Sequence, residues 1–398
     1  MLKIPHFLSV VTLLMVIGCS EPTPLAVVSV SETAGLTRNI EYITTIISLE
    51  EGLKSSETLL VTDLESKRSI PVQIMDTSID GHNYSLEVTF PVSVKANQTK
   101  NLHFSIKEKM RDTLPVNLML SEDQLSVENR FYKASFSTEN DKRGGQIDGI
   151  ILKEFNDQIL KRGHISMHWA PNFSKSDSEG YFTMESLSPS SKNHIRQGLY
   201  QVIKKRSGIS DSVPEIRIKG RYEFYVNSPY FLFESTMIVE KDVQLDLLRN
   251  DEMTMDSLFT HVMYQQKNGE ILHLGLYNNE LDVLEEDHIP DNAPWLAFYN
   301  IDKGYGFGSI RLAYDNTNLD GNPSPTYTPY TKISRASNSG RYWNRVLIGE
   351  TDMMVQKGSR YKEKNAYLVF KVDVRKPEKE IMEYYTRLTS PLVVTVLQ

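Results

Sequence analysis

The stretch from Lys161 to Phe173 (KRGHISMHWAPNF) is the densest group of side chains that could both hold a ligand and move a proton. It contains His164, His168, Trp169 and Asn172. Side chains alternate between the faces of a strand, so a strand here places His164 and His168 on one face and Trp169 on the other. Two residues four apart on a strand stand about 13 Å apart, too far for one metal ion. We therefore predict no metal site here; only a helix would make the two histidines neighbours.

A second group lies in Ser339 to Ile348 (SGRYWNRVLI), where Arg341, Tyr342, Trp343 and Arg345 are close in sequence. Aromatic faces stack on sugar rings, and arginine pairs bidentately with carboxylate or sulfate. We expect these residues to contact a ligand. The alternative is a tryptophan packed in the core and arginines on the surface.

No strong signature motif is present. The chain contains no HExxH, no phosphate loop, no GxSxG and no dinucleotide fingerprint. Beyond the two groups above, the candidates are His261 in FTHVMY, Tyr264 beside it, and Tyr222. For any single histidine the alternative is a structural role. We expect no cofactor.

Composition limits the class of partner. The chain has 398 residues and a net charge of −7, which argues against non-specific binding of nucleic acid or an anionic membrane surface. A local arginine cluster could still bind an anionic ligand. Cys19 is the only cysteine, which excludes an internal disulfide and any thiolate metal site in the mature chain.

The N-terminus reads as a targeting segment. Lys3 supplies the positive charge, and the apolar run from Phe7 to Ile17 is too short to span a membrane. The run ends in Val16-Ile17-Gly18-Cys19, which resembles the lipobox of bacterial lipoproteins. We expect a signal peptide over 1–18, lipidation of Cys19, a tether over 19–26, and attachment to a bacterial membrane, the outer membrane for instance. The alternative is a plain secretory signal with a chance cysteine.

The elements that must position these residues are strands. Short runs rich in Val, Ile, Thr and aromatics, separated by turn residues, predict a small antiparallel β-sandwich over 27–110. A connector follows, and longer alternating runs over 125–398 predict a large antiparallel sheet system. Glu378 to Leu388 is the best helix, entered through Lys376-Pro377. The fold class is therefore predicted to be all-β.

Several segments resemble known families. The run from Arg38 to Ile106 resembles the leading β domain of a family of uncharacterised bacterial lipoproteins found with polysaccharide-degrading enzymes. SVENRFYKASFSTENDKRGGQIDGI and NDEMTMDSLFTHVMY resemble strands of galactose-mutarotase-like supersandwich domains. The resemblance implies a supersandwich over 125–398 and a carbohydrate partner, uronate-containing and sulfated, of the ulvan type. It carries over no catalytic residue.

With such a substrate, the candidates fit a β-elimination. Removing the hydrogen next to a sugar carboxylate needs a neutralised carboxylate, a base, and an acid for the departing oxygen. We predict Arg341 or Arg345 as the neutralising group, His168 as base with His261 as second choice, and Tyr264 or Tyr222 as acid. His164, Trp169, Asn172, Tyr342 and Trp343 would contact the sugar. The enzyme would be a polysaccharide lyase or an oligosaccharide dehydratase.

Two rival functions remain open. A non-catalytic sugar-binding lipoprotein would keep the tryptophans and arginines but would not need His168. A glycoside hydrolase would use paired carboxylates, for which Asp251-Glu252 and the acidic run 285–287 are available. Such acidic runs are more often solvated faces.

Overall fold

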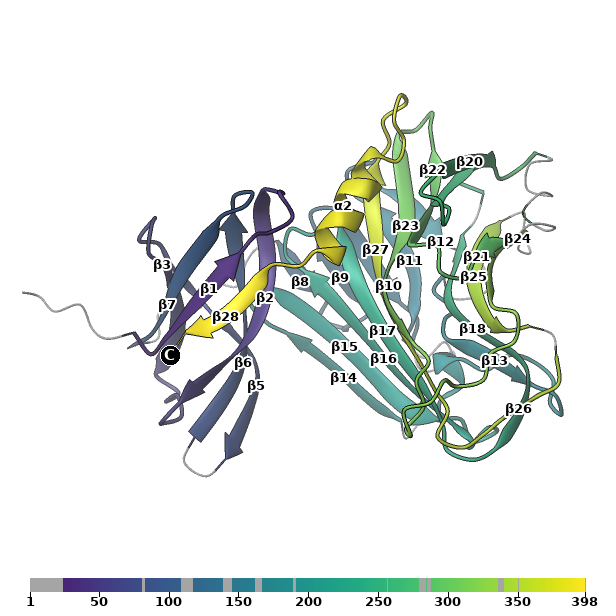
Figure 1. Ribbon diagram of the computed structural model, residues 1–398, viewed down its shortest axis with the longest axis horizontal. Coiled ribbons are helices and arrows are strands. Elements are labelled where there is room, and N and C mark those ends of the chain that lie inside the picture. Colours follow the sequence, from purple (N-terminus) through teal and green to yellow (C-terminus); the bar gives the residue numbers. More distant parts are fainter. Residues whose placement is uncertain are drawn as a thin grey trace, which may run out of the picture.

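The predicted all-β class is confirmed by the structure, a computed structural model (Figure 1). Every pairing between named strands in the part of the chain it describes is antiparallel. The residues described are 24–80, 83–108, 117–138, 145–161, 167–188, 191–255, 257–278, 284, 288–335, 340–349 and 351–397.

The first unit is a small β-sandwich. One sheet has the order β28-β1-β7-β3-β4 and the other β2-β6-β5. Alternation along the strands turns Val28 and Val30 of β1 and Val88 and Phe90 of β6 inward, where they are fully buried. The strands are β1 (Ala26–Ser31), β2 (Arg38–Leu49), β3 (Glu57–Asp63), β4 (Ser69–Pro71), β5 (Gln73–Asp80), β6 (Asn83–Val94), β7 (Thr99–Glu108) and β28 (Val393–Leu397).

The second unit is built on a nine-stranded sheet with the order β14-β15-β16-β17-β27-β23-β22-β19-β20. Its long central strands alternate as the sequence predicts. The strands are β14 (Lys192–Gln197), β15 (Gln201–Ile209), β16 (Ile216–Tyr225), β17 (Tyr230–Val239), β19 (His261–Gln265), β20 (Ile271–Gly275), β22 (Trp295–Asn300), β23 (Tyr305–Asp315) and β27 (Arg360–Lys371).

Two smaller sheets cover the inner face of the nine-stranded sheet. Phe224 and Phe233 on that face share one hydrophobic core with Tyr132 of the first small sheet and Trp343 of the second. The first small sheet has the order β12-β11-β10-β9-β8; the second has the order β13-β18-β25-β24-β21, with β26 paired to β18. Their strands are β8 (Leu118–Leu120), β9 (Ser126–Asn129), β10 (Tyr132–Phe136), β11 (Ile147–Leu152), β12 (Gln158–Lys161), β13 (Asn172–Lys175), β18 (Val243–Met255), β21 (Ile289–Pro290), β24 (Tyr330–Arg335), β25 (Arg341–Ile348) and β26 (Met353–Val355).

Helix α2 (Lys379–Thr389) lies on the outer face of the nine-stranded sheet. Ile381 of the helix is fully buried against Trp295 and Leu368. The helix begins one residue after the predicted start and confirms the predicted segment. A short 3-10 helix, η2 (Met184–Ser186), lies between β13 and β14.

The last strand belongs to the first unit. After α2 the chain crosses back, and β28 pairs along its whole length with β1 (Figure 1). The sequence places 125–398 together in the second unit, but the structure moves Val393–Leu397 into the first sandwich. It also adds Leu118–Leu120 to the second unit, where the sequence predicts a connector.

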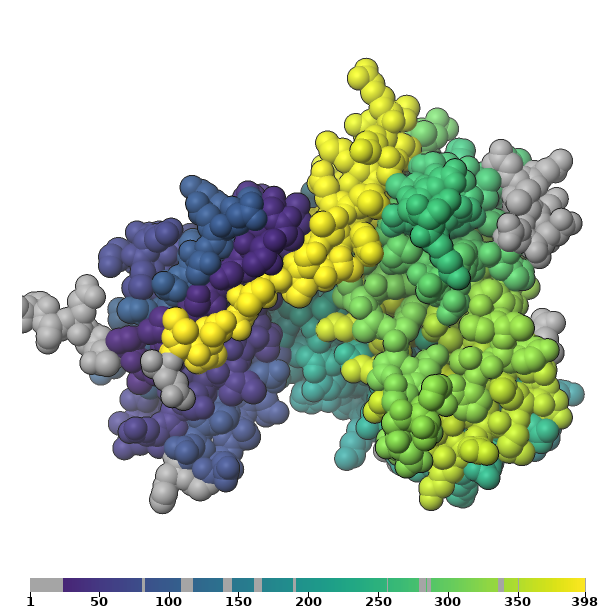
Figure 2. Space-filling model, viewed as in Figure 1, coloured from purple at the N-terminus to yellow at the C-terminus, as the bar shows by residue number. Residues whose placement is uncertain are grey.

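Polar contacts fix the two units against each other. The Arg38 guanidinium of β2 donates to the carbonyls of Arg387, at 2.9 Å, and Ser390, at 2.6 Å. On the sheet side, Tyr200 Oη donates to the Pro71 carbonyl at 2.7 Å, and Arg196 donates to the Ile74 carbonyl at 2.7 Å. In Figure 2 the yellow C-terminal segment crosses this junction.

Candidate functional site

The predicted strand over 161–173 is not continuous. His168 forms only an isolated bridge with Met253, and β13 begins at Asn172, after the Ala170-Pro171 peptide bond. His164 lies outside the described residues, so its predicted ligand contact stays a prediction. The sequence predicts that both histidines lie on one face of a strand. His168 is not part of a strand, so the prediction is wrong for this residue.

His168 lies at the centre of the second unit and is 0% exposed. Its Nδ1 is 2.5 Å from the Tyr222 hydroxyl, and its Nε2 is 3.2 Å from the Tyr367 hydroxyl. Burial lowers the pKa of the imidazole to about 3, so the ring is neutral near neutral pH. A neutral imidazole has one donor and one acceptor nitrogen, and the two tyrosines satisfy both. No polysaccharide can reach this ring, so the prediction of His168 as base and Tyr222 as acid is wrong.

The hydroxyl of Tyr367 connects His168 to a buried carboxylate, Asp251. Tyr367 and Trp343 donate to Asp251 Oδ1 at 3.2 and 3.3 Å, and Ser309 donates to the same atom at 2.8 Å. Further donors on the second oxygen are Arg311 at 3.2 Å and Tyr314 at 3.2 Å. Asp251 sits at an irregularity of β18 with a φ of 50°, which turns its side chain between the sheets. The sequence interpretation of Asp251-Glu252 as a solvated face is wrong.

Glu363 completes this network. Its Oε2 accepts from the Asp251 backbone N–H at 2.8 Å, and its Oε1 accepts from Ser235 at 3.0 Å. Burial, and then the negative charge of Asp251, raise the pKa of Glu363 to about 8. Glu363 therefore holds a proton at neutral pH. Two carboxylates lie together here, but both are sealed in the interior, so this pair has no access to a glycosidic bond.

The two predicted carboxylate-binding arginines are also buried and already bonded within the protein. Arg341 Nε donates to the Leu276 carbonyl at 2.7 Å, and its guanidinium lies 4.1 Å from the centroid of the Tyr277 ring. Arg345 pairs with Asp291 at 3.0 Å and lies over the Tyr314 ring. Neither guanidinium can offer a pair of N–H donors to the carboxylate of a ligand. The group that was expected to neutralise the sugar carboxylate is therefore missing.

The remaining predicted residues serve packing or local bonds. Trp343 is 0% exposed, and Tyr264 is 4% exposed in the same core. Asn172 is fully buried and donates to Glu252 at 2.9 Å. His261, on β19, accepts or donates a bond with Thr260 at 2.8 Å and stacks on Tyr299. Burial corrects the predicted sugar contacts of Trp343 and Asn172 and the predicted role of Tyr264 as acid.

Trp169 and Tyr342 are only partly buried. The Trp169 backbone N–H donates to the Glu252 carbonyl at 3.3 Å, and Tyr342 pairs in register with Thr254 and Ser334. Their predicted contact with a sugar is not tested by these positions.

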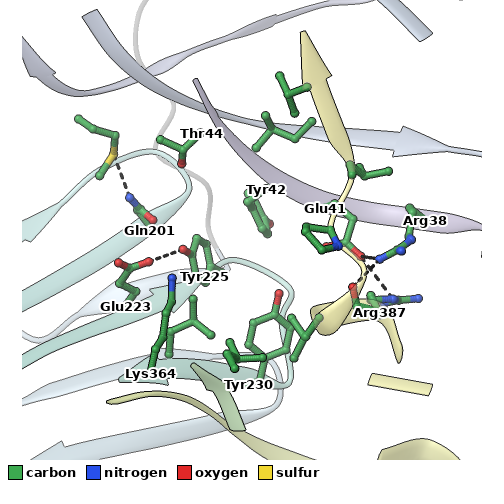
Figure 3. A pocket seen from close by; sticks show the side chains of 18 of the residues that line it. Arg38, Glu41, Tyr42, Thr44, Gln201, Glu223, Tyr225, Tyr230, Lys364 and Arg387 are labelled. Carbon is green, nitrogen blue, oxygen red and sulfur yellow. Dashed lines mark hydrogen bonds and ion pairs between the residues drawn. The ribbon is translucent and has the colours of Figure 1, made fainter. Parts of the chain in front are cut away.

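A different place in the described chain is open to a ligand. A cleft of about 450 Å³ lies between the sandwich and the outer face of the nine-stranded sheet (Figure 3). Strand β2 supplies Tyr42 and Thr44 from one side, and β16 supplies Tyr225 from the other. The rings of Tyr42 and Tyr225 stack with centroids 5.2 Å apart, and Tyr230 lies at the same wall. Apolar ring edges and hydroxyls therefore meet in one recess.

Three carboxylates line the cleft, Glu41, Glu87 and Glu223, and arginines hold two of them. Glu41 lies 3.3 Å from Arg387 and 3.4 Å from Arg38, and burial raises its pKa while both arginines oppose the shift. Glu223 lies 2.5 Å from Arg221 and accepts from Tyr225 Oη at 2.5 Å. These ion pairs hold the two carboxylates in place as polar groups that a ligand could contact. Lys364 points into the cleft and makes no ion pair with another described residue (Figure 3).

Sequence reasoning misses this cleft because its walls are far apart in the chain. Tyr42, Glu223 and Lys364 come from three strands, and each sits in an ordinary alternating pattern. One signal was available in the sequence. The outward positions of β16 are Arg217, Lys219, Arg221, Glu223 and Tyr225, and this face is too polar to be packed under another layer of the fold.

Neither a metal-binding cluster nor a membrane-spanning helix occurs in the described part of the chain. No three His, Asp or Glu side chains there are grouped so that they could hold a metal ion together. No helix there is long and apolar enough to cross a lipid bilayer.

Comparison with known proteins identifies a shared fold but no family. No protein-family model matches the chain, and no curated protein matches its sequence. An α-mannosidase from Enterococcus faecalis V583 is 12% identical, with a TM-score of 0.58 over 94% of this chain and 46% of that one. A protein in glycosyl hydrolase family 38 from Enterococcus faecalis is 11% identical, with a TM-score of 0.56 over 94% and 47%. The chain thus has the fold of about half the length of these proteins.

A galactose mutarotase related enzyme from Lactobacillus acidophilus is less similar. It is 8% identical, with a TM-score of 0.36 over 62% of this chain and 96% of that one, a level that supports no argument.

These findings correct the predicted reaction. The two structures that share the fold carry the names of glycoside hydrolases, not of lyases. The predicted base, His168, and the predicted arginines are sealed in the interior. The prediction of a polysaccharide lyase or dehydratase is therefore wrong.

Proposed function

We propose that this protein binds carbohydrate in the cleft between its sandwich and its nine-stranded sheet. The observation that carries the proposal is the composition of that cleft. Tyr42, Tyr225 and Tyr230 bring aromatic rings and hydroxyls together with charged groups already fixed by pairing. Sugars present apolar ring faces and many hydroxyls, so this combination suits them.

The fold supports the same conclusion. The chain shares its architecture with about half of two proteins named as glycoside hydrolases. We propose binding rather than hydrolysis because arginines pair with two of the cleft's three carboxylates, Glu41 and Glu223, which leaves only Glu87. Asp251 and Glu363 are sealed in the interior. A glycoside hydrolase needs two carboxyl groups facing one glycosidic bond, one as acid and one as nucleophile or base.

Thr44 offers a way to block the cleft without disturbing a core. It is exposed and lines the cleft from β2. Thr44→Trp should fill the recess and lower the affinity for a bound oligosaccharide at least ~10-fold. Thr77→Trp is the matched control, because Thr77 is exposed on β5 of the same small sheet and does not line the cleft.

The measurement is isothermal titration calorimetry with mannotetraose and oligogalacturonates, followed by an assay for new reducing ends. Binding that is lost in Thr44→Trp and kept in Thr77→Trp supports the proposal. Absence of binding to every sugar, or equal binding by both variants, contradicts it. New reducing ends would show hydrolysis and replace the proposal with a catalytic one.

We also propose that Cys19, outside the described residues, carries a lipid that attaches the protein to a bacterial membrane. The support is the sequence Val16-Ile17-Gly18-Cys19 after an apolar run. Expressed in a bacterium fed an alkyne-labelled fatty acid, the wild type should be labelled and sediment with membranes. Cys19→Ser should be unlabelled, whereas Ser20→Ala should behave as wild type. Labelling of Cys19→Ser would overturn the proposal.

A further inference from the structure

The outer face of the nine-stranded sheet carries rows of cations, the first of which runs beside the cleft. Residues paired across neighbouring antiparallel strands point to the same face, so the strand register shows which side chains stand side by side. The first row is His194, Lys205, Arg221, Glu234 and Lys364, and the second is Lys192, Ser207, Lys219, Thr236, Lys362 and Asp315. Below, these two rows are called the cationic rows.

The cationic rows face away from the core. Their neighbours in sequence, such as Tyr222 and Phe233, point inward and are buried. Lys205 and Lys219 are exposed, and Arg221, Lys362 and Lys364 are partly so. On β14 the same face carries Arg196, two residues beyond His194, and its guanidinium reaches the sandwich, so the first unit borders the first row.

The rows have a net positive charge in a negatively charged protein. They hold six cations, counting lysines and the arginine, against the carboxylates of Glu234 and Asp315, which gives +4. The whole chain carries −7. Glu234 pairs with Lys362 at 3.2 Å, and Asp315 pairs with Arg360 outside the rows at 3.2 Å.

Four lysines of the rows have no such partner. Lys192, Lys205, Lys219 and Lys364 make no ion pair with another described residue. Arg221 and Lys364 line both the rows and the cleft, so the two features are continuous. An extended ligand bound in the cleft would therefore continue over ammonium groups that have no ion pair within the described chain.

The geometry points to an anionic oligosaccharide as the ligand: we infer that a carboxylated or sulfated sugar chain lies across the strands on the cationic rows with one end in the cleft. Neighbouring strands are about 4.8 Å apart, and the two rows are separated by two residues, about 6.7 Å. Charges spread at this spacing suit repeated anionic groups along a polymer better than one phosphate. This inference rests on the proposed function in one respect, the placement of one end of the sugar chain in the cleft.

A nucleic acid fits these rows less well. Single strands are held by cations together with aromatic side chains on which bases stack. Neither row contains a tyrosine, tryptophan or phenylalanine. The rings of Tyr42, Tyr225 and Tyr230 lie in the cleft, beside the first row.

Lys205→Gln combined with Lys219→Gln tests the inference, because neither residue lines the cleft and neither forms part of a core. The matched control is Lys267→Gln combined with Lys303→Gln, two exposed lysines in turns of the same sheet. Each full-length protein is titrated with oligogalacturonate, dextran sulfate and neutral mannotetraose, from 20 mM to about 300 mM NaCl. Screening at the higher salt should weaken contacts between exposed charges.

We expect the Lys205/Lys219 variant to bind both acidic ligands at least ~5-fold more weakly at low salt and with less dependence on salt. Mannotetraose binding should be unchanged, and the control variant should match the wild type. Equal binding of acidic ligands by the variant and the wild type overturns the inference. So does a single-stranded RNA of the same charge that displaces the acidic sugar and binds more tightly.

The two proposals fail in different ways. If mannotetraose binds and is blocked by Thr44→Trp while the lysine variant has no effect, the cleft proposal stands and the cationic-row inference fails. If acidic ligands bind in a lysine-dependent way that Thr44→Trp does not alter, the rows bind on their own and the cleft proposal fails.

Discussion

The most unusual residues in the described chain are Asp251 and Glu363, two buried acidic residues joined by a hydrogen bond from the Asp251 backbone N–H to the Glu363 carboxyl group. Asp251 receives five side-chain hydrogen bonds, from Ser309, Arg311, Tyr314, Trp343 and Tyr367. These bonds and the positive charge of Arg311 compensate for the loss of water around one negative charge. Glu363 has no cationic partner among the described residues and keeps its proton instead.

The proton on Glu363 makes stability depend on pH. Its pKa is about 8 when folded, against 4.5 for an unperturbed glutamate. The folded state holds the extra proton between these values, so the free energy of unfolding falls as the pH rises from 4.5 to about 8. Glu363→Gln mimics the protonated form and should remove this fall. We expect the variant to gain on the order of a few kcal/mol relative to wild type between pH 5 and pH 8.

Urea unfolding followed by fluorescence at several pH values measures this difference. Glu234→Gln is the control, because that carboxyl lies on the outer face and reaches water. A pH slope that is the same in wild type and Glu363→Gln would show that Glu363 is not the group responsible.

For single residues, the residue types alone could not distinguish a functional site from a buried polar core. His168, Tyr222 and Trp343 do come together, as the sequence analysis expects of a site, but around a buried aspartate. The histidine, tyrosine and tryptophan that would suit catalysis also suit a satisfied polar core. Only burial distinguishes a catalytic site from such a core. Burial depends on how the small sheets, one of which contains β18, pack against the nine-stranded sheet.

Among the elements, the register of single strands is predictable and their partners are not. The helix predicted over Glu378 to Leu388 is displaced by only one residue. The alternation of Tyr222 and Phe224 with charged residues gives the inward face of β16 correctly. Nothing local to Val393–Leu397 shows that it pairs with Ala26–Ser31, because that pairing depends on where α2 directs the chain.

Arg38 holds the segment between α2 and β28 against the first unit. It is 1% exposed, donates to the carbonyls of Arg387 and Ser390, and pairs with Glu32 at 3.3 Å. Arg38→Ala removes the cation beside Glu32 and both bonds to the carbonyls of Arg387 and Ser390, so this segment should be held less firmly. We expect faster amide hydrogen exchange across Val393–Leu397 and β1, with the inner core of the second unit unchanged.

Hydrogen exchange read by mass spectrometry checks this expectation. Lys54→Ala is the control, since its pair with Glu57 is exposed and such pairs contribute little. Exchange that rises equally in both variants, or in neither, would show that Arg38 does not hold the strand.

For the whole molecule, composition indicates the all-β class but not the place where a ligand would sit. The cleft exists only because the sandwich is set against the outer face of the nine-stranded sheet by contacts such as Arg196 with Ile74 and Tyr200 with Pro71. Each wall is unremarkable alone. The net charge of −7 likewise gives no sign of a positive face, because strand register, not composition, gathers the lysines.

The pairing of β28 with β1 has a consequence for how this protein is made. Val393–Leu397 is translated after all the other described strands, so the edge of β1 stays open until the second unit has been synthesised. The N-terminal sandwich therefore cannot be completed before the second unit has been made. A message with a premature stop codon would yield chains with a bare strand edge, which are prone to aggregate and open to proteases.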